Sequence, residues 1–338
     1  CFKSCPSNAI KMVEEYGFKH AYIDEEQCNN CGLCQSLCPM LREIPQNKIE
    51  KKMLLKLKDN KLIDMSSSGG VFGELSRWII NQKGVVYGAA FNTKFNVEFI
   101  RVADRNNLYK VFCSKYVHSD ISLIFENIKK DLDANKKVLL GATPCQIAAV
   151  KLFLRKEYPN LFSIDLICHG LPSSLLWEKY TNYLSKKGKI KDVNFRYNNK
   201  KAPEKNFLVL YEANKKYNET LYKDPYGYAF LNNIILNESC YKCNFKNSRS
   251  CADLTIGDAH GYNLQKAESK HSLVIVNTKN GEFLLKNVMP KFNNFIEFDI
   301  TFELKNNYPI LHPSPKHFNR EYILQNINNK TIIQLLND

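Results

Sequence analysis

The chain has 338 residues, of which 44% are hydrophobic, enough for a small domain and one full-sized core. No apolar run approaches the length of a membrane span, so we expect no transmembrane helix. The formal charge of +14 comes from lysine pairs spread along the sequence, which argues against nucleic-acid binding. Twelve cysteines, most of them in ligand-like groups, predict a metalloprotein of the reducing cytoplasm.

Residues 28–39 carry the most specific pattern, C-N-N-C-G-L-C-Q-S-L-C-P, or C-x2-C-x2-C-x3-C-P. Three thiolates at this spacing can hold one cubane iron–sulfur cluster, and the fourth, before proline, is directed to a second cluster. Zinc sites instead gather their ligands as two separated pairs, and the spacing of the remaining cysteines argues against a disulfide knot. The pattern therefore predicts an electron-transfer ligand set, which comprises Cys28, Cys31, Cys34 and Cys38.

The start of the chain has the form of the end of another such run. Cys1 is followed by Phe-Lys-Ser and then by Cys5 and a proline. Because the fourth cysteine of each run in a two-cluster ferredoxin ligates the other cluster, we expect Cys5 to join the first three cysteines of the 28–39 run. Cys1 and Cys38 would share the second cluster. Its two other ligands would lie upstream, so we expect the chain to be a fragment.

These patterns divide the chain into three segments. Residues 1–46 are expected to form a ferredoxin-like α+β domain with two [4Fe–4S] clusters, too small to fold without them. Residues 47–64 belong to a polar, lysine-rich stretch and are interpreted as a linker. Residues 65–338 are expected to form the large domain.

The large domain opens with M-S-S-S-G-G at 65–70, followed by a helical pattern that ends near Gly84. Small residues and free N–H groups at a helix start can seat an anion. Strand and helix patterns then alternate, and two strands lead into short turns, A-T-P-C-Q and H-G-L-P-S-S, a layout that presents ligand groups at the edge of a sheet. The fold class is therefore α/β, a mixed sheet with flanking helices. The expected strands are 84–91, 97–102, 137–141 and 162–168, and the expected helices are 121–132, 147–155 and 175–184.

Beyond residue 190 the pattern is richer in strands. Strands are expected at 193–197, 207–211, 253–257 and 272–277. The last two flank a loop that contains G-D-A-H-G. A helix is expected to close the chain at 321–336.

A second cysteine set lies in the large domain. Cys145 and Cys168 each follow a predicted buried strand, and Cys240 and Cys243 form a C-x2-C pair. These four thiolates could hold a third cubane cluster. The alternative is that Cys145 and Cys168 are buried apolar fillers and that the pair binds zinc together with Cys251 and a histidine. The residues alone leave both interpretations open.

A series of motifs follows one another in this chain as it does in the coenzyme F420 hydrogenase/dehydrogenase beta-subunit family, and the resemblance covers nearly the whole sequence. The motifs are S-S-S-G-G-V-F (66–72), G-V-V-Y-G-A-A-F (84–91), S-K-Y-V-H-S (114–119), A-T-P-C-Q-I-A (142–148), D-L-I-C-H-G-L-P-S (165–173), C-Y-K-C-N-F-K (240–246) and D-L-T-I-G-D-A-H-G (253–261).

The resemblance implies a flavin and iron–sulfur oxidoreductase in which FAD converts hydride chemistry into single electrons for the clusters. It also strengthens the third cluster at Cys145, Cys168, Cys240 and Cys243. The residues that the resemblance places around the flavin are Ser67, Ser68, Gly69, Gly70, Lys115, Tyr116, Thr143, Gln146 and Asp258. A lysine, hydroxyls and helix-end amides suit a pyrophosphate.

The chain departs from the family pattern in two places. Ala259 and His260 stand where many relatives carry an aromatic pair, and Cys113 stands where glycine is usual. The first departure leaves the substrate open. His169 is the histidine we would consider for proton transfer, but a structural role is the simpler interpretation, so we assign no catalytic residue.

Two functional hypotheses follow. The first is a cytoplasmic flavin-dependent reductase or dehydrogenase that exchanges electrons between a soluble donor (ferredoxin, reduced F420 or a nicotinamide) and a second substrate. The second is a non-catalytic electron-relay subunit of a larger redox complex. Both predict an electron carrier such as ferredoxin as partner, and the basic charge would suit an acidic one.

Overall fold

A mixed nine-stranded β-sheet forms the middle of the computed structural model, which describes residues 2–42, 51–197, 206–246, 250–259, 270–297 and 307–337. The strands lie in the order β14-β3-β13-β12-β8-β7-β4-β5-β6. Their bounds are β3 Lys51–Leu57, β4 Val85–Phe91, β5 Val97–Val102, β6 Ser119–Asp120, β7 Val138–Ala142, β8 Leu161–Leu166, β12 Leu254–Asp258, β13 Ser272–Val276 and β14 Phe292–Glu297.

The central strands β4, β7, β8 and β12 are paired in parallel, and antiparallel pairs flank them. Strands β7 and β8 are buried over nearly their full length, as expected of parallel strands that are covered on both faces. Because the carboxyl ends of parallel strands meet at one edge, the turns after β7, β8 and β12 lie together there.

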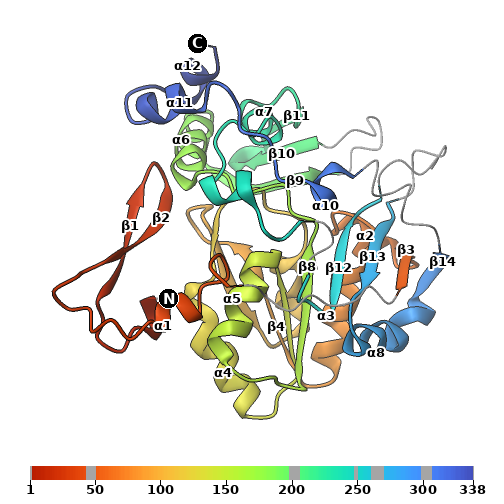
Figure 1. Cartoon of the computed structure of the whole chain (residues 1–338). Coiled ribbons are helices and arrows are strands. Elements are labelled where there is room, and N and C mark those ends of the chain that lie inside the picture. The colour runs from red at the N-terminus through yellow and green to blue at the C-terminus, as the bar shows by residue number, and fades with distance from the viewer. Residues whose placement is uncertain are drawn as a thin grey trace.

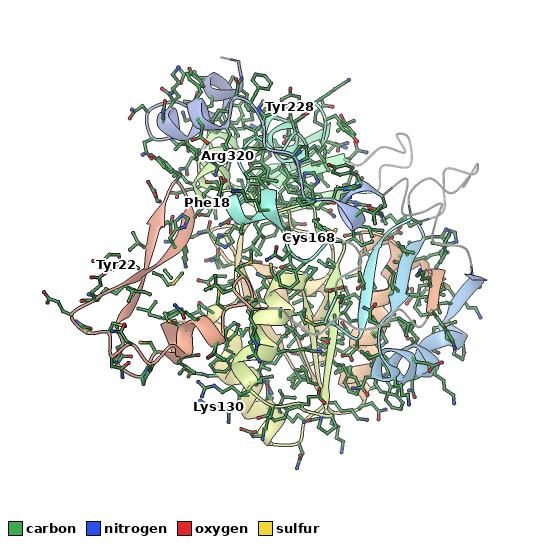
Figure 2. The ribbon with its side chains drawn as sticks, viewed as in Figure 1. Phe18, Tyr22, Lys130, Cys168, Tyr228 and Arg320 are labelled. Atoms are coloured by element: carbon green, nitrogen blue, oxygen red, sulfur yellow. The ribbon has the colours of Figure 1, made fainter. Side chains whose placement is uncertain are left out.

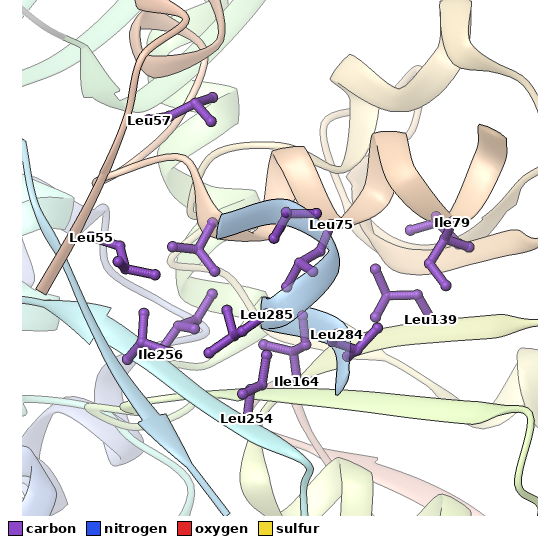
Figure 3. Packing of buried hydrophobic residues seen from close by; sticks show 14 of the residues in the cluster. Leu55, Leu57, Leu75, Ile79, Leu139, Ile164, Leu254, Ile256, Leu284 and Leu285 are labelled. Carbon is purple, nitrogen blue, oxygen red and sulfur yellow. The ribbon is translucent and has the colours of Figure 1, made fainter. Parts of the chain in front are cut away.

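Helices cover both faces of this sheet (Figure 1). On one face, α3 (Val71–Asn81) and α8 (Lys279–Val288) pack against the sheet, and Figure 3 shows their leucines and Ile79 directed at strand residues such as Leu139 and Ile164. On the other face, α4 (Phe125–Asp133) and α5 (Pro144–Leu154) pack on a separate apolar cluster. The observed fold confirms the predicted α/β core.

A smaller antiparallel sheet, β11-β10-β9, lies at the top of Figure 1. Its core is aromatic, with Trp177, Tyr180, Phe195 and Phe207 buried together. The elements around this cluster are β9 Ile190–Tyr197, β10 Asn206–Tyr211, β11 Lys216–Thr220, α6 Ser174–Ser185, α7 Pro225–Leu231, α11 Arg320–Asn326 and α12 Ile332–Asn337.

Two expectations need correction. Part of the predicted linker 47–64 is strand β3, which pairs with β13 and β14 inside the large sheet, and α2 (Asn60–Asp64) follows it. Exposed and half-buried lysines flank three consecutive buried residues of this strand, Met53, Leu54 and Leu55, so the sequence looked polar. The helix expected at 321–336 is two helices, because Thr331 accepts a hydrogen bond from the Gln334 backbone N–H and starts a new one.

The N-terminal part contains η1 (Phe2–Ser4), the hairpin strands β1 (Ile10–Glu15) and β2 (Phe18–Ile23), and α1 (Leu33–Ser36). The hairpin stands out from the rest of the molecule in Figure 1, and its turn docks at the start of α6. There the hydroxyls of Ser173 and Ser174 donate to the carbonyls of Tyr16 and Gly17 at 2.5 and 2.7 Å. Phe18 is buried in the aromatic cluster of the small sheet.

Gly17→Ala is expected to undock this hairpin. A Cβ at Gly17 would lie 2.3 Å from the Leu175 backbone nitrogen and 2.5 Å from Ser173 Oγ. Hydrogen exchange of the β1–β2 amides measures the effect, and we expect at least a tenfold loss of protection, about 1.4 kcal/mol. Gly32→Ala is the matched control, because Gly32 also has a positive φ (70°) but a Cβ there meets nothing within 4 Å. Equal protection in the two variants would contradict the docking role.

The described residues contain no helix that is long and apolar enough to span a membrane. A last short helix, α10 (Tyr308–Leu311), packs against the carboxyl edge of the sheet and closes the site described next.

Candidate functional site

A cavity of about 340 Å³ lies at the carboxyl edge of the large sheet. Its walls are the turn before α3, the segment 111–119, the turns after β7 and β8, and the end of β12. Most residues that the sequence assigned to a flavin line it. They are Ser67, Ser68, Gly70, Lys115, Tyr116, Thr143, Gln146 and Asp258.

The serine–glycine turn is held against two strands. The Ser68 hydroxyl donates to the His271 carbonyl at 2.5 Å, and the Gly69 N–H donates to Ser272 Oγ at 2.8 Å. Gly69, unlike its neighbours, does not line the cavity, because it packs on the backbone of β3 and β13. Gly70 has φ 83° and caps the start of α3. The turn therefore presents two serines and a helix N-terminus to the cavity.

Lys115 is half-buried at the cavity wall. Its Nζ donates to the carbonyls of Phe112 and Cys113 at 2.8 and 3.2 Å. Burial lowers the pKa of Lys115 to about 8. Next to it, the Tyr116 ring stacks on Phe230 with 4.7 Å between ring centroids. The segment thus offers one amine of reduced basicity and one flat aromatic face.

Thr143 and Gln146 form the cap of α5. The Thr143 backbone N–H and hydroxyl both donate to Gln146 Oε1, at 3.2 and 3.0 Å, and Gln146 Nε2 donates to the Ser119 carbonyl. The structure therefore gives both residues a capping role in addition to their place at the cavity.

Arg196, on β9, is a site residue that the sequence reasoning missed. Its guanidinium binds Asp258 with two hydrogen bonds, of 2.7 and 3.1 Å. It also donates to the Ser67 carbonyl at 2.8 Å and to the Tyr116 hydroxyl at 3.0 Å. One arginine thus joins three of the predicted cavity walls to the small sheet. Only its position on an alternating strand could have indicated it, since alternate residues of β9 face away from the aromatic core.

Arg196→Met is expected to destabilise the protein by about 3 kcal/mol, because it removes the buried guanidinium that is paired with the Asp258 carboxylate. The Arg196 side chain is 12% exposed and that of Asp258 is 21% exposed, which puts the cost at the lower end for buried pairs. Urea unfolding measures this cost. Arg101→Met, which breaks the Arg101–Asp131 pair on another part of the sheet, is a control that should retain the cavity and its ligand. Unchanged stability of Arg196→Met would contradict a stabilising role for the Arg196–Asp258 pair.

A second cavity, of about 60 Å³, is surrounded by four cysteines. Cys145 lies in the first turn of α5, and Cys168 follows β8. Cys240 lies in the short 3-10 helix η5 (Glu238–Lys242), and Cys243 directly follows that helix. Burial raises the pKa of the Cys145 and Cys168 thiols, and that of Cys240 to about 11. For Cys168, the proximity of the other three thiols adds to the effect of burial. The structure therefore brings the predicted third ligand set together.

The zinc alternative required Cys251, which lies elsewhere. Cys251 is buried in the apolar cluster of α4 and α5 and does not line the four-cysteine cavity. In the part of the chain that the structure describes, no group of three or more His, Cys, Asp or Glu residues is close enough together to hold a metal ion. A cluster is larger than a single ion, and a cavity between the thiols is the space it needs.

The two cavities adjoin. Cys168 and His169 line both, as do Leu166 and Leu171 beside them. Figure 2 shows Cys168 near the middle of the molecule, between the small and large sheets. His169 Nε2 lies 3.1 Å from the Phe230 carbonyl oxygen, in agreement with a structural role for this histidine.

The N-terminal cysteines lie at or near the surface. Cys31 is exposed, and Cys5, Cys28, Cys34 and Cys38 are half-buried. Cys5 follows η1, which packs against α1, where Cys34 is located. Two residues of interest lie outside the described residues. They are Cys1, which was predicted as a cluster ligand, and His260, one of the departures from the family pattern.

Comparisons with known proteins give matches for two parts of the chain. Residues 135–296 match the family model for the C-terminal part of the coenzyme F420 hydrogenase/dehydrogenase beta subunit. Residues 135–296 thus belong to the F420 hydrogenase/dehydrogenase beta-subunit family. Residues 1–41 match the 4Fe-4S dicluster domain. Both matches confirm the resemblance seen in the sequence.

The fold of the chain is found among solved structures. A chain of the F420-reducing [NiFe] hydrogenase complex from Methanosarcina barkeri, in a structure of its xenon derivative, superposes with a TM-score of 0.54 at 15% identity. The match covers 79% of the present chain and 93% of the other. No curated protein matches the sequence.

Proposed function

We propose that this beta-subunit family member is an iron–sulfur flavoprotein oxidoreductase. It would pass electrons between a soluble donor (ferredoxin, reduced F420 or a nicotinamide) and a second substrate by way of FAD and [4Fe–4S] clusters. The observation that carries the proposal is the wall shared by the two cavities, in which Cys168 faces the four-cysteine cavity and the large one. A cofactor in each would be close enough for electron transfer.

The large cavity suits a flavin nucleotide. The serine–glycine turn at a helix N-terminus and the amine of Lys115 would bind the pyrophosphate. Tyr116 and Phe230 offer aromatic faces for a ring, and Asp258, held by Arg196, offers a fixed carboxylate. Bound FAD would supply the conversion of hydride transfer into single-electron transfer.

The cysteines would hold the clusters in two groups. Cys145, Cys168, Cys240 and Cys243 would bind one cluster in the large domain. In the ferredoxin-like part, Cys5, Cys28, Cys31 and Cys34 would bind another, with Cys1 and Cys38 as ligands of a third. Thiolate ligands of this kind require a reducing compartment, for which we propose the cytoplasm. We place the domain boundary near residue 46, with β3 already part of the flavin-binding unit.

Anaerobic purification and reconstitution of the chain tests this proposal. We expect one FAD per chain and iron and sulfide in equal amounts, with at least four of each from the large domain. Zinc without flavin would overturn the assignment.

The second candidate is an electron-relay subunit without a substrate of its own. It is favoured by the similar solved chain, which is part of a hydrogenase complex. Reduction or oxidation of a small substrate by the isolated, reconstituted chain supports the enzyme. Electron exchange with carriers alone supports the relay subunit.

The affinity for FAD is expected to fall as the pH rises through about 8. The Lys115 amine carries its charge below its pKa of about 8, and the charged amine favours the pyrophosphate. Since a bound anion raises the lysine pKa, the dissociation constant should rise by up to about tenfold per pH unit above 8. Quenching of flavin fluorescence measures it between pH 6.5 and 9.5. Lys115→Met should bind weakly with a flat profile, and the same slope in both proteins would exclude Lys115 as the titrating group.

A further inference from the structure

A buried lysine lies at the four-cysteine cavity. Lys246, three residues after Cys243, lines the cavity and is 6% exposed. Its Nζ donates to the Cys168 carbonyl at 2.6 Å and to the Pro309 carbonyl at 2.8 Å. One hydrogen bond therefore reaches the backbone of a proposed cluster ligand, and the other holds the C-terminal segment that closes the cavity.

The hydrogen bonds that the structure gives the Lys246 amine go to two neutral backbone carbonyls. Within the residues that the structure describes, no ion pair with Lys246 is formed. Asp165 also lines the cavity, and its Oδ2 accepts a 2.6 Å hydrogen bond from Ser250, but burial raises the pKa of Asp165 to about 7. A buried ammonium with so little compensation is costly unless an anion occupies the cavity.

We propose that Lys246 is the fixed counter-charge of an iron–sulfur cluster held by Cys145, Cys168, Cys240 and Cys243, and that it raises the reduction potential of this cluster. The inference rests on the proposed function, because it requires that cluster. A cubane with four thiolates carries a charge of about −2, and uptake of one electron makes it about −3 without breaking a bond. A nearby cation stabilises the reduced form more than the oxidised form, and the effect is large in a buried, poorly screened site.

The same lysine also has a packing role, which the test must separate from its charge. Arginine keeps the positive charge and the donors, whereas methionine keeps most of the volume and loses both. Lys151 supplies a control, because its Nζ also donates to a backbone carbonyl, that of Cys251, but it does not line the cavity.

The experiment is a potentiometric titration of the whole chain, reconstituted anaerobically and followed by electron paramagnetic resonance. The signal that disappears in Cys240→Ser is assigned to the large-domain cluster. For Lys246→Met we expect the equilibrium constant for reduction of this cluster to fall at least tenfold, which is 59 mV for one electron. Lys246→Arg and Lys151→Met should change it less than twofold.

Each outcome decides the matter. A change under twofold in Lys246→Met, or an equal change in Lys151→Met, overturns the inference. If Lys246→Met binds no cluster, measured as iron and sulfide per chain, the cluster content of Lys246→Arg separates charge from packing. A cluster retained in Lys246→Arg supports the role of the charge, and loss of the cluster in both variants overturns the inference. If Cys240→Ser neither removes nor alters any signal of the wild-type spectrum, the cluster itself is absent, and the proposed function fails rather than the role of Lys246 alone.

Discussion

Gly69→Ala is expected to abolish flavin binding and to lower the free energy of unfolding by about 3 kcal/mol. A Cβ at this position would lie 2.0 Å from the Leu55 carbonyl oxygen and 2.6 Å from the Ser272 backbone nitrogen. Both atoms belong to paired strands, β3 and β13, so neither can move without breaking the sheet. The turn would be displaced, and with it Ser67, Ser68 and the N-terminus of α3.

Thermal unfolding of the metal-free and flavin-free protein measures the cost. A loss of about 3 kcal/mol lowers the midpoint by roughly 6–12 °C for a domain of this size. Gly73→Ala is the control, because Gly73 belongs to the helix that follows the turn and lines the cavity, and its Cβ would meet only the Leu62 side chain, at 3.0 Å and beyond. The control should keep both flavin and most of its stability. Equal midpoints and equal flavin content in the two variants would show that the turn is not fixed by Gly69.

The sequence was sufficient where local pattern and tertiary structure agree. The alternating apolar segments of the large domain formed the predicted strands and helices, and β5 (Val97–Val102) has the bounds that were predicted. The cavity brings together the serine–glycine turn and Lys115, which are distant in sequence, because both flank the carboxyl edge of one sheet. That edge follows from the alternation of strands and helices.

The sequence was insufficient where contacts with a distant segment determine the structure. Strand β3 is rich in lysine, and only its place between β13 and β14 buries Leu54 and Leu55. Arg196 belongs to the small sheet, and no local pattern relates it to Asp258, 62 residues further on. Likewise, the spacing of Cys145 and Cys168 gives no sign that they lie near each other, and only the fold places both beside the C-x2-C pair.

Cys168→Ser is the variant expected to have the largest effect on metal content. It should lower iron and sulfide by about four atoms each per chain, since an incomplete ligand set does not retain a [4Fe–4S] cluster. FAD content should change little, because the turn at 66–70 and Lys115 remain in place. Cys113→Ser is the matched control. Cys113 is also a half-buried cysteine, but it lines only the large cavity, and its iron content should equal that of the wild type.

The position of Cys168 makes this variant more informative than the other three cysteines. Cys145, Cys240 and Cys243 face the small cavity, whereas Cys168 lies in the wall shared with the large one. Suppose that the clusters of the ferredoxin-like part receive electrons through this wall. In Cys168→Ser a soluble donor should then still reduce the bound flavin, but electron transfer from the flavin to those clusters should slow at least tenfold. Stopped-flow absorbance separates the two events. Unchanged iron content would show that Cys168 is a buried filler, and unchanged transfer after loss of iron would place the electron path elsewhere.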